Sequence, residues 1–219
     1  MRCLLPVAAL ALALAVPAAA GTITGKVDLV DKPGRRKADL SEVVVFLDSV
    51  RVKPRPATVS MAMKGKTFTP HVVAVPVGGT VEFPNEDPIF HNAFSVSGPN
   101  RFDLPLYKRP KSGAQTFQHP GVVKVYCNIH PQMSAVVVVV DNPYFTRVAS
   151  DGTFTVENVP AGKHRLKAWH ERAGETTVVV TVPEKGETAA SAMRLDATTW
   201  KREQHKNKFG KDYSGDEKY

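Results

Sequence analysis

The chain has 219 residues, of which 42% are hydrophobic and 23% are charged, enough to bury a core in one large or two small domains. Its 17 prolines and 15 glycines are spread along the chain and favour many short strands over long helices. The net charge of +8 comes from dispersed Lys and Arg residues without an aromatic platform among them, which argues against nucleic-acid binding.

The first twenty residues differ from the rest of the chain. Arg2 gives a short basic start, residues 4–16 are apolar, and residues 18–20 are small. This pattern predicts a secretory signal with cleavage after Ala20, and hence a periplasmic or secreted protein. The alternative is a membrane anchor, but the apolar stretch is too short to span comfortably and no other segment is long enough. Removal of the signal leaves Cys127 as the single cysteine, which in an oxidising compartment is buried and inert, reactive, or a metal ligand.

The next part of the chain predicts two strands followed by a break. Residues 21–30 alternate apolar and polar side chains, and residues 43–47 form a nearly continuous apolar run, which is typical of a buried strand. A basic, turn-rich loop over residues 31–37 separates the two. The prolines within residues 53–56 interrupt the pattern and indicate a linker.

A second group of strands is predicted between residues 57 and 143. Gly78 and Gly79 make a turn, and the β-branched run over residues 134–140 has high strand propensity. The strands that we expect in this part cover residues 71–77, 80–83, 115–117, 122–126 and 134–140.

The last part of the chain predicts three alternating strands and a tail. The strands cover residues 151–156, 164–169 and 176–182 and are joined by tight turns. Residues 197–219 are polar and charged with little periodicity, and we interpret them as a tail.

One short loop carries the side chains with the most distinctive chemistry. Cys127, His130 and Met133 offer a thiolate, an imidazole and a thioether at spacings of three, directly after a predicted strand. Thiolate and thioether together are soft ligands that suit copper better than zinc or magnesium. A second imidazole would complete a trigonal His₂Cys set with a weak axial methionine, and His91 is placed to supply it.

These residues also carry a resemblance to a known family. Residues 57–143 resemble the cupredoxins, and the Cys-x-x-His-x-x-Met spacing is most similar to amicyanins and plastocyanin-like domains. The matching motifs are Phe83-Pro-Asn85, Asp87, His91-Asn92, Pro120-Gly121 and Tyr126-Cys127-x-x-His130-Pro131-x-Met133. The resemblance implies one type-1-like copper ion with His91, Cys127, His130 and Met133 as ligands. It also implies that Asn92 ties the two ligand loops together and keeps the site rigid.

Each candidate ligand has an ordinary alternative. A lone cysteine or methionine is more often part of a core, and a lone histidine is more often structural or solvated, so the joint occurrence favours a metal. Zinc or another ion remains the alternative to copper. The spacing disfavours a binuclear copper centre, and the sequence has no catalytic triad, phosphate loop or carboxylate pair, so we expect no enzyme activity. The remaining histidines are expected to be structural or solvated; they are His71, His119, His164, His170 and His205.

The segments on either side of residues 57–143 resemble another β-sandwich family. Residues 21–56 look like the opening strands of a carboxypeptidase-regulatory-like, transthyretin-like sandwich, and residues 144–196 look like its closing half. We therefore expect an all-β protein in which a Greek-key cupredoxin sandwich is inserted in, or joined to, a second small Ig- or transthyretin-like sandwich. In the rival interpretation, the N-terminal strands belong to the cupredoxin itself.

The resemblance to cupredoxins implies a one-electron carrier whose redox partner docks near His130. Pro88, Ile89, Phe90 and Pro131 are candidates for an apolar docking patch, and Lys108, Arg109 and Lys111 could steer an acidic partner or simply face solvent. The alternative function is copper binding, buffering or delivery, with the second sandwich as a docking module. Binding of nucleic acid or another anionic surface is a third, disfavoured option. The sequence does not specify the oligomeric state.

Overall fold

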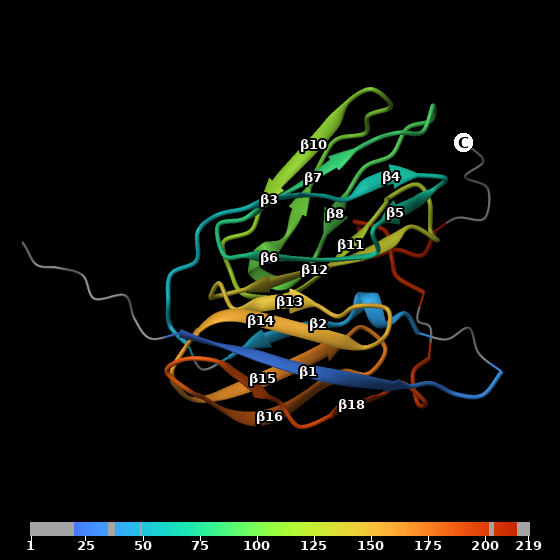
Figure 1. The fold of residues 1–219 in the computed structure, drawn as a ribbon. Helices are drawn as coiled ribbons and strands as arrows, with labels where there is room; N and C mark the ends of the chain where they lie inside the picture. The colour runs from blue at the N-terminus through green and yellow to red at the C-terminus, as the bar shows by residue number, and fades with distance from the viewer. Residues whose placement is uncertain (1–19, 35–37, 49, 202–203, 214–219) are drawn as a thin grey trace, which may run out of the picture.

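The computed structural model describes residues 20–34, 38–48, 50–201 and 204–213, and most of these residues lie in or between β-strands (Figure 1). The expectation of an all-β protein is confirmed. Apart from Ala20, the predicted secretory signal lies outside the described residues. Within the described part of the chain, no helix is long and apolar enough to cross a membrane. The strands form two sandwiches, seen one above the other in Figure 1.

The upper half of the molecule is formed by strands β3 to β12, and we call it the middle sandwich. One of its sheets has the order β6-β12-β11-β8-β9, the second has the order β10-β7-β3, and β4 and β5 form a hairpin beside them. The strands are β3 (Thr58–Ser60), β4 (Ala62–Lys64), β5 (Thr67–Thr69), β6 (Val72–Pro76), β7 (Thr80–Pro84), β8 (Phe94–Ser95), β9 (Phe102–Asp103), β10 (Ser112–Thr116), β11 (Gly121–Tyr126) and β12 (Ser134–Val140). A 3₁₀ turn, η2 (Gly98–Asn100), precedes β9.

The lower half of the molecule is formed by β1, β2 and β13 to β18, and we call it the flanking sandwich. One sheet has the order β14-β1-β17, with β18 also paired to β1, and the other has the order β13-β2-β15-β16. The strands are β1 (Ala20–Val30), β2 (Val44–Leu47), β13 (Phe145–Arg147), β14 (Thr153–Pro160), β15 (Gly162–His170), β16 (Gly174–Val182), β17 (Glu187–Ala189) and β18 (Met193–Asp196). A 3₁₀ turn, η1 (Leu40–Glu42), leads into β2.

In the flanking sandwich, the first strands of the chain pair with its last strands. Strand β1 pairs antiparallel with β14 and parallel with β17 and β18, while β2 lies between β13 and β15. Among the described residues, β1 and β2 therefore form no ladder with β3 to β12. Strands β3 to β12 form their ladders among themselves.

Each sandwich has its own hydrophobic core because inward side chains alternate with outward ones along the strands. In β11, Val123 and Val125 are buried whereas Val122 and Lys124 are exposed, the pattern of a strand with one covered face. Strand β12 is different, since six of its seven residues are buried. One face of β12 contributes to the core of the middle sandwich and the other faces the flanking sandwich.

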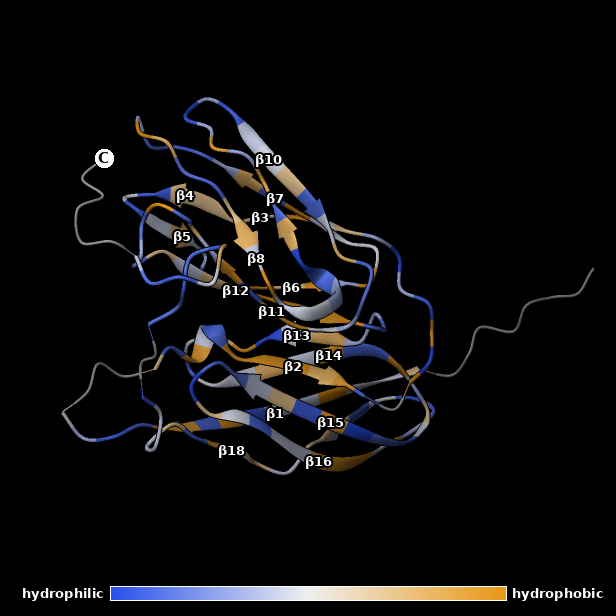
Figure 2. Ribbon diagram, turned by 180° about the vertical axis from the view of Figure 1, so that it is seen from behind, coloured by the Kyte–Doolittle hydropathy of each residue, from blue (hydrophilic) through white to orange (hydrophobic). Residues whose placement is uncertain are grey.

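A third hydrophobic cluster joins the two sandwiches. It contains Val72 from β6 and Val136, Val138 and Val140 from β12, packed against residues of the flanking sandwich that include Val44. Figure 2 shows β2 and β12 coloured as hydrophobic where the two halves meet. The four sheets are thus stacked with three apolar layers between them: the core of each sandwich and the cluster that joins the sandwiches. The sheet that carries β12 is covered on both faces.

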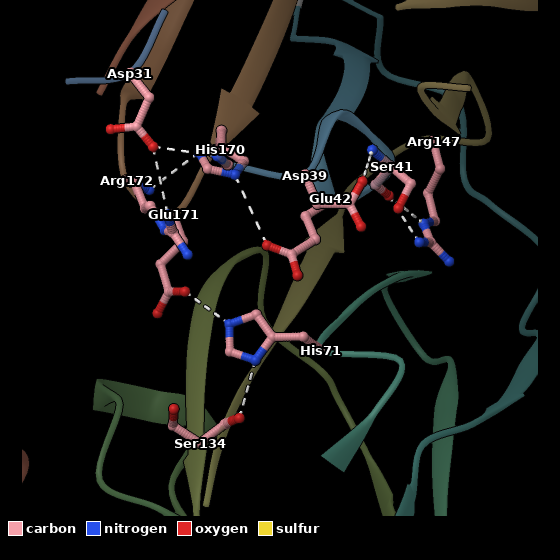
Figure 3. Close-up of polar contacts among 11 residues, drawn as sticks. Asp31, Asp39, Ser41, Glu42, His71, Ser134, Arg147, His170, Glu171 and Arg172 are labelled. Carbon is pink, nitrogen blue, oxygen red and sulfur yellow. Dashed lines mark hydrogen bonds and ion pairs between the residues drawn. The ribbon is translucent and has the colours of Figure 1, made fainter. Parts of the chain in front are cut away.

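Polar side chains flank this apolar interface (Figure 3). His71, just before β6, has its Nε2 atom 2.7 Å from a carboxylate oxygen of Glu171 in the β15–β16 turn. Its Nδ1 atom lies 3.0 Å from the carbonyl oxygen of Ser134, the first residue of β12. The wholly buried His170 lies nearby, 3.8 Å from a carboxylate oxygen of Glu42. The ion pair of His71 and Glu171 therefore bridges the two sandwiches beside their shared core.

Burial of the His71 ring lowers its pKa, but the hydrogen bond and charge of Glu171, assisted by Glu42, outweigh burial and hold the pKa above its usual 6.5. Burial raises the pKa of Glu171, but the hydrogen bond and charge of His71 hold that pKa below its usual 4.5. The His71 contribution to stability is complete below pH 6.5 and is lost as pH rises through the raised pKa. The Glu171 contribution is complete above pH 4.5 and is lost as pH falls through the lowered pKa.

The pair therefore stabilises the folded protein most between these two values. We expect Glu171→Gln to lower the free energy of unfolding by about 1 kcal/mol or less near pH 5.5, because the two side chains are 28% and 26% exposed and their interaction is partly screened. The loss should be smaller well above the raised pKa of His71. Urea unfolding of both proteins across this pH range measures the difference. The double variant His71→Gln with Glu171→Gln serves as the control, and it should lack the pH dependence. A loss of stability that is equal at pH 5.5 and at pH 9 would contradict the assignment.

Candidate metal centre

The residues with ligand chemistry lie at one end of the middle sandwich. Cys127, His130 and Met133 belong to the connection between β11 and β12, whose strands pair up to Tyr126 and Ser134. The connection folds into a tight turn because the Cys127 N–H donates to the Met133 carbonyl (3.2 Å) and the Met133 N–H donates to the His130 carbonyl (3.0 Å). We call residues 127–133 the metal loop.

His91 approaches the metal loop from the connection between β7 and β8. Its backbone exchanges two hydrogen bonds with Tyr107, of 3.0 and 2.9 Å, which form an isolated β-bridge. These bonds fix the backbone of His91. The side chain points inward and is wholly buried.

The donor atoms of His91, Cys127 and His130 converge. The Nδ1 atoms of the two histidines are 3.0 Å apart, and the Cys127 Sγ atom lies 3.6 Å from Nδ1 of His130. All three ligand atoms lie within 4.8 Å of one another, and this is the one such cluster among the described residues. An ion with bonds of about 2.0 Å to nitrogen and about 2.3 Å to sulfur, at tetrahedral angles, would place the nitrogens about 3.3 Å apart and nitrogen and sulfur about 3.5 Å apart. The three side chains can therefore share one metal ion.

Met133 is wholly buried and belongs to the same hydrophobic cluster as Cys127. Its backbone closes the metal loop through the hydrogen bonds described above. The metal loop therefore brings a thioether into the same buried region as the three converging side chains. Its role as an axial ligand stays a prediction.

The site favours a neutral His130 ring and a protected thiol. Burial, followed by the nearby His91 and Lys66, lowers the pKa of His130 to about 4, so its ring is neutral at physiological pH. Burial raises the pKa of the Cys127 thiol, against the opposing effect of backbone hydrogen bonds. A bound cation would displace the thiol proton, because the thiolate is the form that ligates.

Asp87 orients the ring of His91. One of its carboxylate oxygens lies 2.8 Å from Nε2 of His91. A carboxylate only accepts hydrogen bonds, so Nε2 carries the proton and Nδ1 presents its lone pair toward Cys127 and His130. The same carboxylate accepts the backbone N–H groups of Gly65 (2.8 Å) and Lys66 (3.0 Å).

The charge of Asp87 is stabilised by these contacts. Its burial raises the pKa, but the backbone hydrogen bonds from Lys66 and Gly65, together with His91, hold the pKa below its usual range. The turn between β4 and β5 thus fixes the Asp87 carboxylate, which in turn fixes the ring of His91. In the sequence, Asp87 was only one of the positions that match the family motif and had no role assigned; the signal available was an acidic residue four positions before a candidate ligand.

Asn92 joins the two ligand loops, as the resemblance implied. Its side-chain oxygen accepts the backbone N–H of Asn128 in the metal loop at 2.8 Å, and the residue is buried. The backbone that follows His91 is thereby tied to the backbone that follows Cys127. This bond fixes the distance between the two loops independently of any ion.

The surface above the metal loop is apolar. Of the three converging residues, His91 and Cys127 are wholly buried whereas 7% of His130 is exposed. A shallow pocket at this edge is lined by His130 with Pro88, Ile89, Phe90, Leu106, Lys108 and Ile129. Phe90 and Leu106 are each 50% exposed, and the Lys108 ammonium lies 5.5 Å from the centre of the Phe90 ring. Of the predicted patch, Pro88, Ile89 and Phe90 line this pocket.

The other histidines lie outside the cluster. His71 and His170 are in the interface between the sandwiches, His164 contacts the carbonyl oxygen of Pro160 at 2.7 Å, and His119 is exposed. His205 was expected to be structural or solvated, and its ring stacks on Tyr126 beside the metal loop. Nothing in the sequence pattern signalled that contact.

Comparisons with known proteins give one family match and several distant structural matches. The model of the ER membrane protein complex subunit 7 β-sandwich domain matches residues 127–209, less than half of the chain. The match begins at the metal loop and runs through the flanking sandwich. It names a different β-sandwich family from the one that the flanking sequences resemble. No curated protein sequence matches the chain.

Among solved structures, a copper-containing nitrite reductase from Thermus scotoductus is 29% identical, with a TM-score of 0.36, over 52% of this chain; the match spans 28% of that enzyme. A purple cupredoxin from Nitrosopumilus maritimus is 25% identical over 36% of this chain and 97% of its own, with a TM-score of 0.33. An amicyanin variant in the Cu(I) state is 25% identical over 37% and 81%, with a TM-score of 0.36. We therefore argue function from the site itself.

Proposed function

We propose that the protein is an exported one-electron carrier that holds one copper ion at His91, Cys127 and His130, with Met133 as a weak fourth ligand. The observation that carries the proposal is the convergence of two imidazole nitrogens and one thiol sulfur at distances that a single ion can bridge. A soft thiolate with two imidazoles and a thioether is a donor set that suits copper. We infer export from the predicted N-terminal signal, and a periplasmic or secreted location follows from it.

Copper bound by these ligands would supply a one-electron couple between Cu(I) and Cu(II). The residues of the chain make the site rigid: Asp87 fixes the His91 ring, Asn92 fixes the spacing of the loops, and burial excludes water. A site that moves little between two oxidation states is suited to electron transfer rather than to the binding of a substrate. We accordingly propose a carrier and not an enzyme.

The exposed edge of His130 is the proposed point of electron entry and exit. The apolar pocket of Phe90, Leu106 and Ile129 surrounds it, and Lys108 adds a positive charge at the rim. An apolar centre with a positively charged rim fits a transient protein partner that carries an acidic patch. Added salt would slow the association of the two proteins.

A redox titration separates this proposal from copper buffering or delivery. The copper-loaded protein should be reduced and reoxidised reversibly, with one electron per chain and no loss of the ion. Release of copper on each reduction, or the absence of any reversible couple, would favour copper handling instead.

Asp87 offers a prediction about the strength of the site. We expect Asp87→Asn to weaken Cu(II) binding by about 10- to 100-fold, the usual effect of removing a partner behind a metal-bound histidine. The reduction potential should rise, because the carboxylate charge stabilises Cu(II) more than Cu(I) and the variant lacks it. The control is Glu86→Gln, which removes the neighbouring negative charge that pairs with Lys64 on the surface. Equal effects of the two variants in a copper competition assay would show that Asp87 acts only through its charge.

Met133 offers a prediction about the potential. We expect Met133→Leu to retain copper and to raise the reduction potential by about 59 mV for each tenfold loss of Cu(II) affinity relative to Cu(I), because a donor to Cu(II) is lost. The potential is measured by voltammetry. Met61→Leu, which changes another wholly buried methionine of the same core, is the matched control. An unchanged potential in Met133→Leu would argue against axial ligation.

A further inference from the structure

The C-terminal segment of the described chain returns to the metal loop. Residues 204–213 follow the last strand of the flanking sandwich and rise beside the molecule to the middle sandwich, as the red trace in Figure 1 shows. The sequence predicted only a polar tail here. The segment instead contacts three consecutive residues, Tyr126, Cys127 and Asn128, at the start of the metal loop.

Each contact has a defined geometry. The Tyr213 hydroxyl donates a hydrogen bond of 2.8 Å to the backbone carbonyl of Cys127. The backbone N–H of Lys208 donates to the side-chain oxygen of Asn128 at 3.0 Å. The ring of His205 stacks on the ring of Tyr126 with centroids 4.0 Å apart and planes inclined by 20°.

The segment is organised internally in a way that presents Tyr213. The side-chain oxygen of Asn207 accepts the backbone N–H groups of Phe209 and Lys211, which makes a compact turn. The Tyr213 ring packs edge-on against His205, with centroids 5.3 Å apart and an angle of 86°. The aromatic rings of Tyr126, His205 and Tyr213 therefore form one continuous cluster beside the metal loop.

The start of the metal loop is thus held from two sides. From inside, Asn92 accepts the N–H of Asn128 and the Met133 carbonyl accepts the N–H of Cys127. From outside, Tyr213 holds the Cys127 carbonyl. The peptide group between Cys127 and Asn128 is therefore hydrogen-bonded at both its carbonyl and its N–H. With this backbone fixed, the Cys127 side chain has little freedom to move.

We infer that Tyr213 is a positioning residue for Cys127, and that residues 204–213 serve the metal loop by delivering its hydroxyl to the Cys127 carbonyl. The inference rests on the proposed function in that Cys127 is taken as a copper ligand. It goes beyond that function because it assigns residues 204–213 a role in fixing the metal loop. The two sandwiches are then joined at the metal loop as well as across their shared apolar interface.

The variant Tyr213→Phe tests this inference, because it keeps the edge-on ring contact with His205 and removes only the hydroxyl, which besides its bond to Cys127 lies 3.3 Å from Nδ1 of His205. In the copper-loaded protein we expect release of copper to a chelator to be about 3- to 10-fold faster, the effect of one neutral hydrogen bond. The visible charge-transfer band and the reduction potential should shift, while the melting temperature falls by about 4 °C or less. A purely structural role would lower the melting temperature and leave the band and the potential in place.

A second measurement does not need copper. In a Cys3→Ser background Cys127 is the single thiol, and the metal-free protein can be labelled with a thiol reagent. We expect Tyr213→Phe to speed the labelling of Cys127, again by about 3- to 10-fold, because the buried thiol becomes exposed more often. His205→Ala, which removes the stack on Tyr126, should act in the same direction. Tyr144→Phe is the control, since Tyr144 packs against the core of the flanking sandwich.

The two measurements keep the inference separate from the proposed function. Faster labelling in Tyr213→Phe supports the positioning role even if the wild-type protein fails to bind copper, a result that would reject the copper proposal alone. Labelling and copper release that both match the wild-type values would overturn the positioning role while leaving the copper proposal intact.

Discussion

We expect Cys127→Ser to abolish the intense visible absorption of the Cu(II)-loaded protein. That absorption arises from charge transfer between a thiolate and Cu(II), and the chain has no other described thiol near the cluster. Serine is nearly the same size as cysteine, so the tight turn of the metal loop and the core around it should persist. Circular dichroism and thermal unfolding of the metal-free variant test that the fold is kept.

The control for this experiment is His119→Gln, which changes an exposed histidine outside the cluster. This variant should keep the wild-type band at one copper per chain. Survival of the band in Cys127→Ser would refute the ligand set, because no other residue of the cluster can supply a sulfur anion.

The second large effect is expected at the interface between the two sandwiches. We expect Val138→Asp to lower the free energy of unfolding by about 3–5 kcal/mol, the usual cost of leaving a charge buried without a partner. Val138 is 3% exposed and packs in the apolar cluster between β12 and the flanking sandwich. Asp48, Asp141 and Glu175 line the pocket at its edge, so the new carboxylate meets like charges there. Urea denaturation followed by circular dichroism measures the change.

Val179→Asp is the matched control. Val179 lies on β16 of the flanking sandwich and is 55% exposed, so the same substitution should change the free energy of unfolding by about 0.5 kcal/mol or less. A Val138→Asp protein as stable as this control would mean that the two sandwiches do not depend on their common interface for stability.

The longer strands could be predicted from sequence because their pattern is local. The run Ser134–Val140 was predicted to the residue, and the strands around residues 72–76, 80–84 and 121–126 were placed within a residue or so. Their β-branched and alternating residues specify an extended conformation without reference to the rest of the chain.

The shortest strands could not be predicted because their partners define them. Strands β17 and β18 have three and four residues, and they exist as parallel partners of β1, far away in sequence. Strands β8 and β9 have two residues each and carry no recognisable period. A register between distant segments depends on the assembled sheets, which a local pattern does not describe.

The site was predicted to a similar extent. His91, Cys127 and His130 converge as expected, since their residue types and spacing mark one short loop and one distant partner. The residues that support them were harder to find. Asp87 and Tyr213 act through hydrogen bonds whose partners are set by tertiary structure, and an acidic residue in a loop or a tyrosine in a polar tail is common in any sequence.

The most direct test of the account is an optical and paramagnetic resonance spectrum of the purified chain after loading with Cu(II). We predict an intense visible charge-transfer band and the signal of a single Cu(II) site, both reaching their maximum at one copper per chain. A colourless copper-loaded protein, or a signal that requires several copper ions per chain, would contradict a mononuclear site formed by His91, Cys127 and His130.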